Sequence, residues 1–313
     1  MKILIYGAGV LGSYLAHTLL KAGHEVTLLA RGRRLANLAA SGLVIRHHIQ
    51  RITTVDRPRL VEELTPEDQY DAVAAVMQKP QMEEILPILA ANRRCGLFLL
   101  VGNNGEAEKT RERFLSLHGG NPTVLFGFLA AGGRREGERV ICVHRGKTSL
   151  TVGSVPSGFD CKPVLAPIFS NTDIQLHYAR DMGAWLKYHI AVVLPICCAI
   201  HWAEGNMVRL GLSRQMMQTG IRGIGEGIAV LEKLGIPNEP PTDDASLKKA
   251  PFKLRLLLRI LCLLPMGKLM ARDHAMSALD EMNELSREMK SLRLKANIPT
   301  PALDELEVHL KSV

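Results

Sequence analysis

One glycine-rich motif near the start of the chain constrains the fold more than any other feature. The motif is Gly7-Ala8-Gly9-Val10-Leu11-Gly12, and it follows the apolar run Lys2–Tyr6. Ser13–Lys21 then has helical spacing, and Glu25–Ala30 is a second run of strand formers. A G-x-G-x-x-G motif between a strand and a helix, inside a βαβ unit, is typical of a dinucleotide-binding Rossmann fold.

Each position of this loop has a physical role in such a fold. Gly7 permits a tight turn, Gly9 lets the backbone approach a pyrophosphate, and Gly12 lets the helix and the strand pack closely. The start of the helix offers N–H groups and the positive end of its dipole to the phosphates. We therefore predict that the cofactor is bound by Gly7, Ala8, Gly9, Val10, Leu11 and Gly12; a glycine turn without a ligand is the alternative.

The residues after the second strand discriminate between the two nicotinamide cofactors. NAD enzymes place an acid there for the ribose hydroxyls, whereas NADP enzymes place an arginine near the 2′-phosphate. Here the residues are Ala30-Arg31-Gly32-Arg33-Arg34, without an acid. We predict that Arg31 contacts the 2′-phosphate of NADPH and that Arg33 or Arg34 assists. A solvated basic loop is the alternative.

Strand and helix patterns alternate until about residue 178, and strand patterns are nearly absent afterwards. The further predicted strands are Gly42–Arg46, Asp71–Met77, Gly96–Val101, Thr123–Phe128, Arg139–Val143 and Thr148–Val152, with helices at Gln81–Ala91 and Glu106–Leu117. Long helices are predicted at Asp181–Ile200, Gln215–Leu234 and Ala271–Lys295. The sequence therefore predicts an α/β fold: a Rossmann-type parallel sheet domain that binds NADP over 1–178, then an all-helical substrate or dimerisation domain over 179–313.

Composition excludes several function classes. The net charge is +8, but aromatic residues are only 4% and no nucleic-acid motif accompanies the charge, so we expect no nucleic-acid partner. The six cysteines form no Cys-x-x-Cys pair, which favours reduced thiols and no metal site. We expect a cytoplasmic protein, since no signal-peptide pattern is present and His189–Ile200 is too short to span a bilayer. Lys253–Met266 is basic and apolar, and it fits either a membrane or partner contact or a core or lid helix.

The chain resembles the ketopantoate reductase (2-dehydropantoate 2-reductase) family over nearly its full length. Met1–Gly42 is similar to the opening of that family almost position for position. Asn103-Asn104-Gly105 resembles its Gln-Asn-Gly turn, and Trp185-Leu186-Lys187 resembles the Trp-x-Lys that begins its first C-terminal helix. Tyr70–Val73 with Gln81–Pro87, and Asn297–Pro301, resemble two further segments.

The resemblance implies that NADPH reduces a 2-oxo acid, by default ketopantoate to pantoate. It implies a catalytic lysine at Lys187 and an assisting glutamate at Glu281. It also implies that Asn104 contacts both cofactor and substrate, and that Gln78 stands at a cofactor position where the family has a lysine. A cation near the carbonyl suits this chemistry, because hydride addition builds negative charge on the oxygen.

The sequence departs from the family where the substrate would bind. The family pattern Lys-x-x-x-Asn-x-x-x-Asn-Pro becomes Lys187, Ala191 and Pro195, and neither replacement offers an amide. The segment Lys268–Asp273 replaces a serine-containing motif and retains only its aspartate, Asp273. The predicted substrate positions are Asn104, Ala191, Pro195 and Asp273.

Three functions remain open from the sequence. The first is an NADPH-dependent reductase of a small 2-oxo acid. The second is an NADP-dependent oxidoreductase of a less polar carbonyl compound, because the family asparagines are missing. The third is a non-catalytic NADP-binding protein. A homodimer is possible in each case.

Overall fold

The computed structural model describes residues 1–144, 146–240, 251–264 and 267–310. The chain forms two compact units. The first contains Met1–Gly102 and Glu106–Met182, and the second contains Asn103–Gly105 and the chain from Gly183 onward. The three residues Asn103–Gly105 therefore belong with the second unit although they lie within the sequence of the first.

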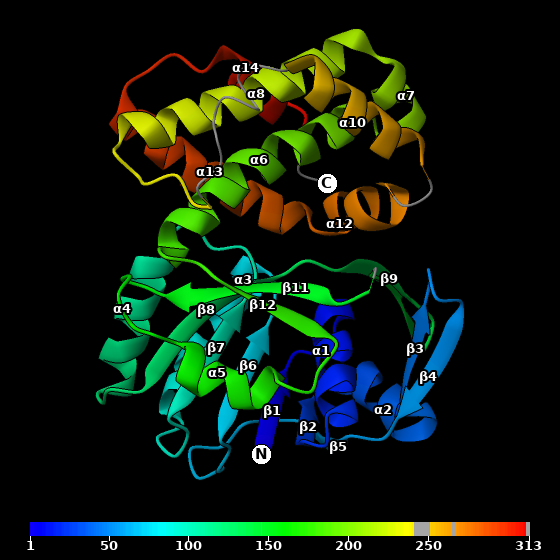
Figure 1. The fold of residues 1–313 in the computed structure, drawn as a ribbon, viewed down its shortest axis with the longest axis vertical. Helices are drawn as coiled ribbons and strands as arrows, with labels where there is room; N and C mark the ends of the chain where they lie inside the picture. The colour runs from blue at the N-terminus through cyan, green and yellow to red at the C-terminus, as the bar shows by residue number, and fades with distance from the viewer. Residues whose placement is uncertain (145, 241–250, 265–266, 311–313) are drawn as a thin grey trace. The chain divides into compact units, whose positions relative to one another are not determined.

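An eight-stranded sheet forms the centre of the first unit (Figure 1). Its order is β12 (Ile174–Tyr178), β11 (Thr148–Ser154), β8 (Thr123–Leu129), β7 (Leu97–Val101), β6 (Ala72–Val76), β1 (Lys2–Tyr6), β2 (Glu25–Leu29) and β5 (Arg59–Val61). Neighbouring strands are parallel except β11 and β8. From β5 to β8 this is the strand order of a Rossmann fold, as predicted.

The apolar strand sequences account for this sheet. All residues of β6 and β7 are buried, as parallel strands covered on both faces require. The connecting helices of this unit are α1 (Val10–Lys21), α2 (Gly32–Ser41), α3 (Lys79–Ala91), α4 (Ala107–His118) and α5 (Lys162–Phe169). The sequence prediction missed α2, α5, β5 and β12. It was wrong to end the strands at Val152, since β12 extends the sheet parallel to β11.

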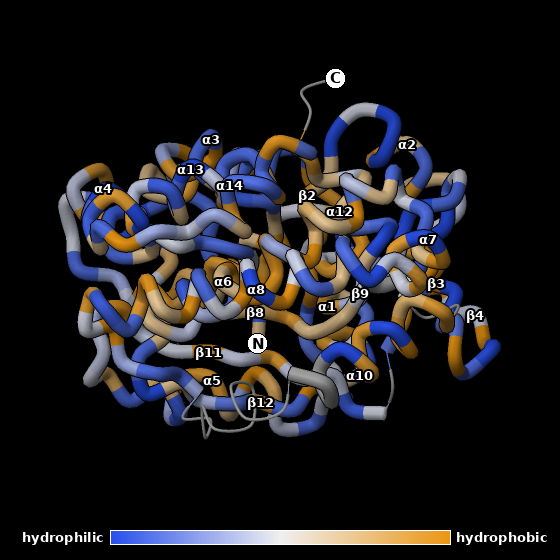
Figure 2. Tube along the Cα trace, turned by 90° about the horizontal axis from the view of Figure 1, so that it is seen from above, coloured by the Kyte–Doolittle hydropathy of each residue, from blue (hydrophilic) through white to orange (hydrophobic). Residues whose placement is uncertain are grey.

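The second unit is helical apart from its connections, as predicted. Its helices are α6 (Met182–Trp202), α7 (Met207–Leu212), α8 (Arg214–Lys233), α10 (Pro251–Leu263), the π-helical turn η1 (Lys268–Arg272), α12 (Asp273–Ser277), α13 (Leu279–Ala296) and α14 (Pro301–Glu307). Hydrophobic and hydrophilic residues both occur along α10 (Figure 2). The prediction of one helix over Ala271–Lys295 was wrong, because Ala278 leaves helical geometry at φ −122° and ψ 38°.

Helix α6 is the apolar centre of this unit. It is long and apolar enough to cross a membrane, but two thirds of its most apolar stretch, 67%, is buried inside the protein, which is typical of a core helix. It packs against α8 along a line of glycines. A Cβ atom at Gly227 would lie 3.1 Å from the Cβ of Ala191, and one at Gly223 would lie 3.2 Å from the Cβ of Pro195. We call this contact the α6–α8 seam.

A four-stranded sheet packs beside α1 in the first unit. Its order is β4 (Ile52–Asp56), β3 (Leu43–His47), β10 (Arg139–Val143) and β9 (Gly132–Glu136). The prediction missed β4 and β9. Strand β9 comes close to α1 because Gly133 lacks a side chain: a Cβ there would lie 2.0 Å from the carbonyl oxygen of Ile141 and 3.1 Å from Val10 Cγ1.

Three histidines lie between this small sheet and α1. His47 on β3 is 3% exposed, and its Nδ1 lies 2.9 Å from Nε2 of His144. The rings of His17 and His47 have centroids 5.0 Å apart, and His17 Nδ1 lies 2.7 Å from a carboxylate oxygen of Asp56. Burial, with the neighbouring His17 and His144, lowers the pKa of His47 to about 4. Within the described residues no group of His, Cys, Asp or Glu side chains is arranged to hold a metal ion.

We predict from these histidines that the free energy of unfolding decreases in acid. Unfolded His47 takes up a proton near its ordinary pKa of 6.5, but the folded protein takes it up only at about 4. Between these values the unfolded state binds more protons, so the free energy of unfolding falls as the pH falls. Urea unfolding at about pH 7 and about pH 5 measures this decrease, and His47→Gln should make it smaller.

The neighbouring residue provides the control for this measurement. His48 is exposed, so His48→Gln should leave the pH dependence of the wild-type protein unchanged. An identical pH dependence in His47→Gln and in the wild type would show that His47 does not cause it.

Candidate functional site

The glycine-rich loop has the geometry that its sequence requires. Gly7 has φ +118°, and a Cβ there would lie 2.5 Å from the carbonyl oxygen of Val76. A Cβ at Gly12 would lie 1.9 Å from the carbonyl oxygen of Gly7, so only glycine lets α1 begin this close to β1. At Gly9 nothing lies within 4 Å of the same position, which leaves its backbone open to a ligand.

The loop lies where the strand order of the sheet reverses, between β1 and β6. Ligands bind at this point in open α/β sheets. Helix α1 starts at Val10, and neither a side-chain cap nor an acidic residue occupies its first turn. Gln78 follows β6 as the N-cap of α3 and is half-buried, one residue after Met77, whose side chain lies near Gly7. The edge of the sheet therefore combines a helix N-terminus with the loop that carries Gln78.

The arginines after β2 have different partners. Arg31 is exposed; its guanidinium hydrogen-bonds the hydroxyl of Tyr6 and the carbonyl oxygen of Glu62. Arg34 turns toward the glycine-rich loop. Its Nε donates to the carbonyl oxygen of Ala8 at 3.1 Å, and its Nη2 donates to Ser13 Oγ at 3.3 Å. Arg34 thus ties α2 to the first turn of α1.

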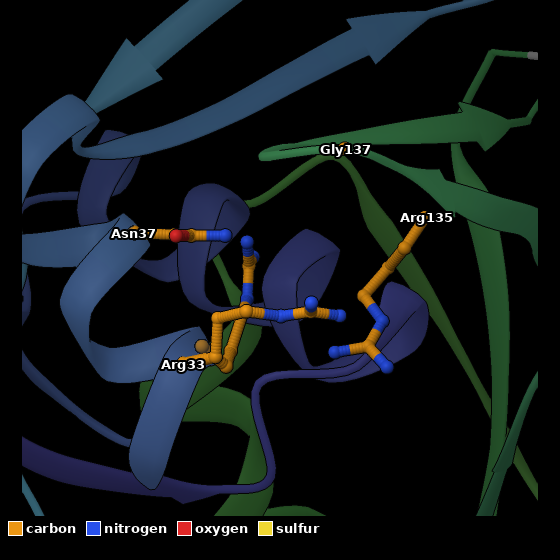
Figure 3. A pocket seen from close by; sticks show the side chains of 5 residues that line it. Arg33, Asn37, Arg135 and Gly137 are labelled. Atoms are coloured by element: carbon orange, nitrogen blue, oxygen red, sulfur yellow. The ribbon is translucent and has the colours of Figure 1, made fainter.

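A pocket of about 270 Å³ opens beside this contact (Figure 3). It is lined by Arg33, Arg34 and Asn37 from α2, by Arg135 from β9 and by Gly137 after β9. We call it the arginine pocket. Among the residues that the structure describes, no carboxylate forms an ion pair with these three arginines. Burial, together with the charge of Arg135, lowers the pKa of the Arg34 guanidinium. The pocket therefore concentrates positive charge that an anion would neutralise.

Lys79 is held inside the fold and does not extend this cationic surface. It is 4% exposed, and its Nζ lies 2.7 Å from Glu83 Oε1 and 3.0 Å from Thr110 Oγ1. Arg113 also contacts Glu83, at 2.8 Å. Lys79 thus joins α3 to α4. Its ammonium group is engaged in these contacts, so it does not supply a cation for the cofactor beside Gln78.

Lys187 lies on α6 in the helical unit. It is half-buried, and its Nζ lies 3.4 Å from the carbonyl oxygen of Gly183, one turn earlier. On the same helix the rings of Trp185 and His189 stack with centroids 5.1 Å apart. Burial, with a contribution from His274, lowers the pKa of His189 to about 4. Lys187 therefore lies on a helix whose nearby imidazole, that of His189, is neutral at neutral pH.

Glu281 lies in the first turn of α13 and is 2% exposed. Its Oε2 is 3.6 Å from Nε2 of His274, and burial lowers the pKa of that histidine. The start of a helix favours a carboxylate. Asp273 precedes this histidine on α12 and contacts the guanidinium of Arg272 at 3.1 Å. His274 thus lies close to Glu281 in space and directly follows Asp273 in the sequence.

Asn104 is 5% exposed and belongs to the three-residue segment that groups with the helical unit. The segment is held by Glu288 of α13, whose Oε2 accepts a hydrogen bond of 2.8 Å from the N–H of Gly105. A Cβ at Gly105 would lie 2.7 Å from the same carboxylate oxygen, so any larger residue there would make the Glu288 side chain shift. A buried carboxylate therefore positions the turn that carries Asn104.

Ala191 and Pro195 both lie in the α6–α8 seam. Ala191 is fully buried against Gly227, and Pro195 is buried against Gly223. Their assignment as substrate positions stays a prediction, since here both side chains pack against another helix. Sequence reasoning missed Asn37, Arg135, His274 and Glu288. Of these, Arg135 and Glu288 lie far in sequence from the motifs that they accompany.

Comparison with known proteins identifies relatives. The family model described as ketopantoate reductase PanE/ApbA matches residues 3–157. A 2-dehydropantoate 2-reductase of Mesorhizobium japonicum is 36% identical over 92 residues, which are 28% of this chain. The matched segment also spans only 28% of that relative's length.

Solved structures share the whole fold. The 2-dehydropantoate 2-reductase from Geobacter metallireducens has a TM-score of 0.78 at 16% identity, over 99% of both chains. D-mandelate dehydrogenase in complex with NADH and anilino(oxo)acetate has a TM-score of 0.77 at 18% identity, over 99% of this chain and 97% of that one. The family model matches the nucleotide-binding unit, and these structures share both units; the chain belongs to the ketopantoate reductase family of oxidoreductases.

Proposed function

We propose that this protein is an NADPH-dependent reductase of a 2-oxo acid, with 2-dehydropantoate reduced to pantoate as its default reaction. The observation that carries this proposal is the arginine pocket beside the glycine-rich loop. It supports a phosphorylated nicotinamide dinucleotide, and membership of the ketopantoate reductase family supports the 2-oxo acid.

The arginine pocket suits the 2′-phosphate of NADPH. Three guanidinium groups meet there without a carboxylate partner among the described residues, and Arg34 also contacts the glycine-rich loop. Arginine binds phosphate oxygens through paired hydrogen bonds, and such charge-assisted bonds are the stronger ones. NADH has a hydroxyl at this position and would leave the arginines without an anion. Arg31 remains a second candidate for the phosphate, although Tyr6 and Glu62 bind its guanidinium here.

The loop itself suits the pyrophosphate. The N-terminus of α1 lacks a side-chain cap, and the open position at Gly9 leaves room for phosphate oxygens near its N–H groups. When bound, NADPH would supply the hydride that reduces the substrate. The chain's own residues then have to orient the substrate, stabilise the charge on its carbonyl oxygen and deliver a proton.

Lys187 is the residue that we propose to contact the carbonyl oxygen of the substrate. An ammonium group stabilises the negative charge that develops on a carbonyl oxygen and can donate the proton. Glu281 is the proposed assistant, since it is a buried carboxylate of the same helical unit. Asn104, whose turn Glu288 holds, is the proposed amide contact for cofactor and substrate.

A second candidate substrate class is favoured by one observation. The family resemblance assigns positions 191 and 195 to the substrate, and the side chains of Ala191 and Pro195 offer it no hydrogen bonds. A site that lacks these amides loses affinity for a hydroxylated substrate. D-mandelate dehydrogenase, which shares this fold, was solved with an aromatic oxo acid, anilino(oxo)acetate. We therefore include aromatic 2-oxo acids as the alternative; higher kcat/KM for phenylglyoxylate than for ketopantoate would select them.

The arginine pocket makes a cofactor prediction. Arg135→Ala removes one guanidinium, so the Kd for NADPH should rise about tenfold or more, because a hydrogen bond to a charged group contributes about 1.5–3 kcal/mol. The Kd for NADH should stay unchanged. Titration of cofactor fluorescence measures both constants.

A neighbouring arginine is the matched control. Arg134 lies on the same strand but pairs with Glu136 outside the pocket, so Arg134→Ala should change neither constant. Equal losses for NADPH and NADH in Arg135→Ala would contradict the assignment of the pocket to the 2′-phosphate.

The second prediction concerns Lys187. Lys187→Ala should leave the Kd for NADPH within about twofold but lower kcat for 2-oxo acid reduction by about a hundredfold or more, since positioned acid catalysis contributes about 10²–10⁴-fold. NADPH absorbance with ketopantoate and a panel of 2-oxo acids follows the rate. Lys290→Ala, at an exposed position of α13, should retain full activity.

Two results would count against this function. Unchanged turnover in Lys187→Ala would show that this lysine takes no part in the reduction. Tight NADPH binding by the wild-type protein without turnover of any tested carbonyl compound would instead favour a non-catalytic NADP-binding protein.

A further inference from the structure

Helix α10 is apolar on two sides, and within the described residues only one of them packs inside the protein. Cys262 is 6% exposed and faces α7, where a Cβ at Gly211 would lie 3.0 Å from its Cβ. On the other side the exposed residues are Leu256, Leu257, Ile260, Leu263 and Leu264, with exposed fractions of 44–64%. Spacings of three and four residues put these five on one helix face. We call this face the α10 stripe.

The neighbouring helix continues this surface. Helix α7 packs against α10, and its Val208 and Leu212 are 45% and 61% exposed. Leu263 of the α10 stripe lies near Gly211, next to Leu212. Isolated apolar residues on a surface need no explanation, but a continuous set across two helices marks an interaction site.

The chain between Asp244 and Asp273, which contains α10, is basic. Residues 245–272 contain seven lysines and arginines and no aspartate or glutamate. Arg259 on α10 and Lys268 on η1 are exposed within this segment. Lys248 and Lys249 lie outside the described residues, as do Pro265 and Met266 of the basic apolar segment Lys253–Met266. Apolar residues beside cations, without acids, are typical of helices that bind an anionic membrane surface.

We propose that the α10 stripe, with Val208 and Leu212, docks on an anionic lipid bilayer. A second copy of the chain would bring the same positive segment against this one, and like charges oppose that contact. An amphipathic partner peptide needs a groove, whereas this surface is the outer side of a helix. A bilayer interface accepts an apolar helix side and places anionic headgroups beside Arg259 and Lys268.

Vesicle co-sedimentation of the full-length protein tests this proposal. We expect binding to vesicles of phosphatidylcholine with phosphatidylserine, weak binding to phosphatidylcholine alone, and loss of binding at high salt. Arg259→Gln should lower the partition coefficient about fivefold, because each basic residue near an anionic surface contributes about that factor. Leu257→Ser should lower it about tenfold, because a buried leucine is lost from the bilayer contact.

Matched variants separate this effect from unfolding. Leu294 of α13 is 74% exposed and lies outside the stripe, so Leu294→Ser should partition like the wild type. All variants should keep the wild-type circular dichroism spectrum. The absence of binding to the anionic vesicles would overturn the proposal, and so would a concentration-dependent dimer, without vesicles, that Leu257→Ser dissociates. NADPH titration of the same samples tests the proposed function independently.

Discussion

The approach of the α1 backbone to β1 is the contact on which the nucleotide-binding unit depends. The Cβ position of Gly12 lies 1.9 Å from the carbonyl oxygen of Gly7, a separation that no side chain permits. Because the helix begins so close to the strand, its N-terminal N–H groups open at the edge of the sheet where the strand order reverses. Arg34 donates hydrogen bonds to the carbonyl oxygen of Ala8 and to Ser13 Oγ, which joins α2 to the same turn. A larger residue at Gly12 would displace all of these groups together.

The first thirty residues could be predicted closely because their information is local. Strand, glycine loop, helix and second strand follow one another without a break, and each glycine has a steric reason that can be stated from the motif alone. The all-helical character of the second unit could also be predicted from local patterns, because strand patterns end near Tyr178. The break at Ala278 could not be predicted, because residues 271–295 contain neither glycine nor proline. Ala278 is buried where one helix ends and the next begins, so the break depends on its surroundings in the fold and not on a local sequence signal.

The arginine pocket shows where sequence reasoning stops. Arg33 and Arg34 directly follow the second strand and can be predicted from the motif, but Arg135 comes from β9, about one hundred residues later. The sequence of that strand is Gly-Gly-Arg-Arg-Glu, which has poor strand propensity. Its pairing with β10 and its approach to Val10 bring Arg135 to the pocket. The same limit applies to Glu288, whose bond to Gly105 joins residues 183 positions apart.

The α6–α8 seam has a consequence for any attempt to change substrate choice by mutation. Positions 191 and 195 cannot be varied without regard to α8, because Gly227 and Gly223 of that helix pack against their side chains. A larger side chain at either position has little room beside α8, so placing an amide there calls for accompanying changes on both helices. A laboratory selection for new specificity would succeed sooner by mutating α6 and α8 as a paired library.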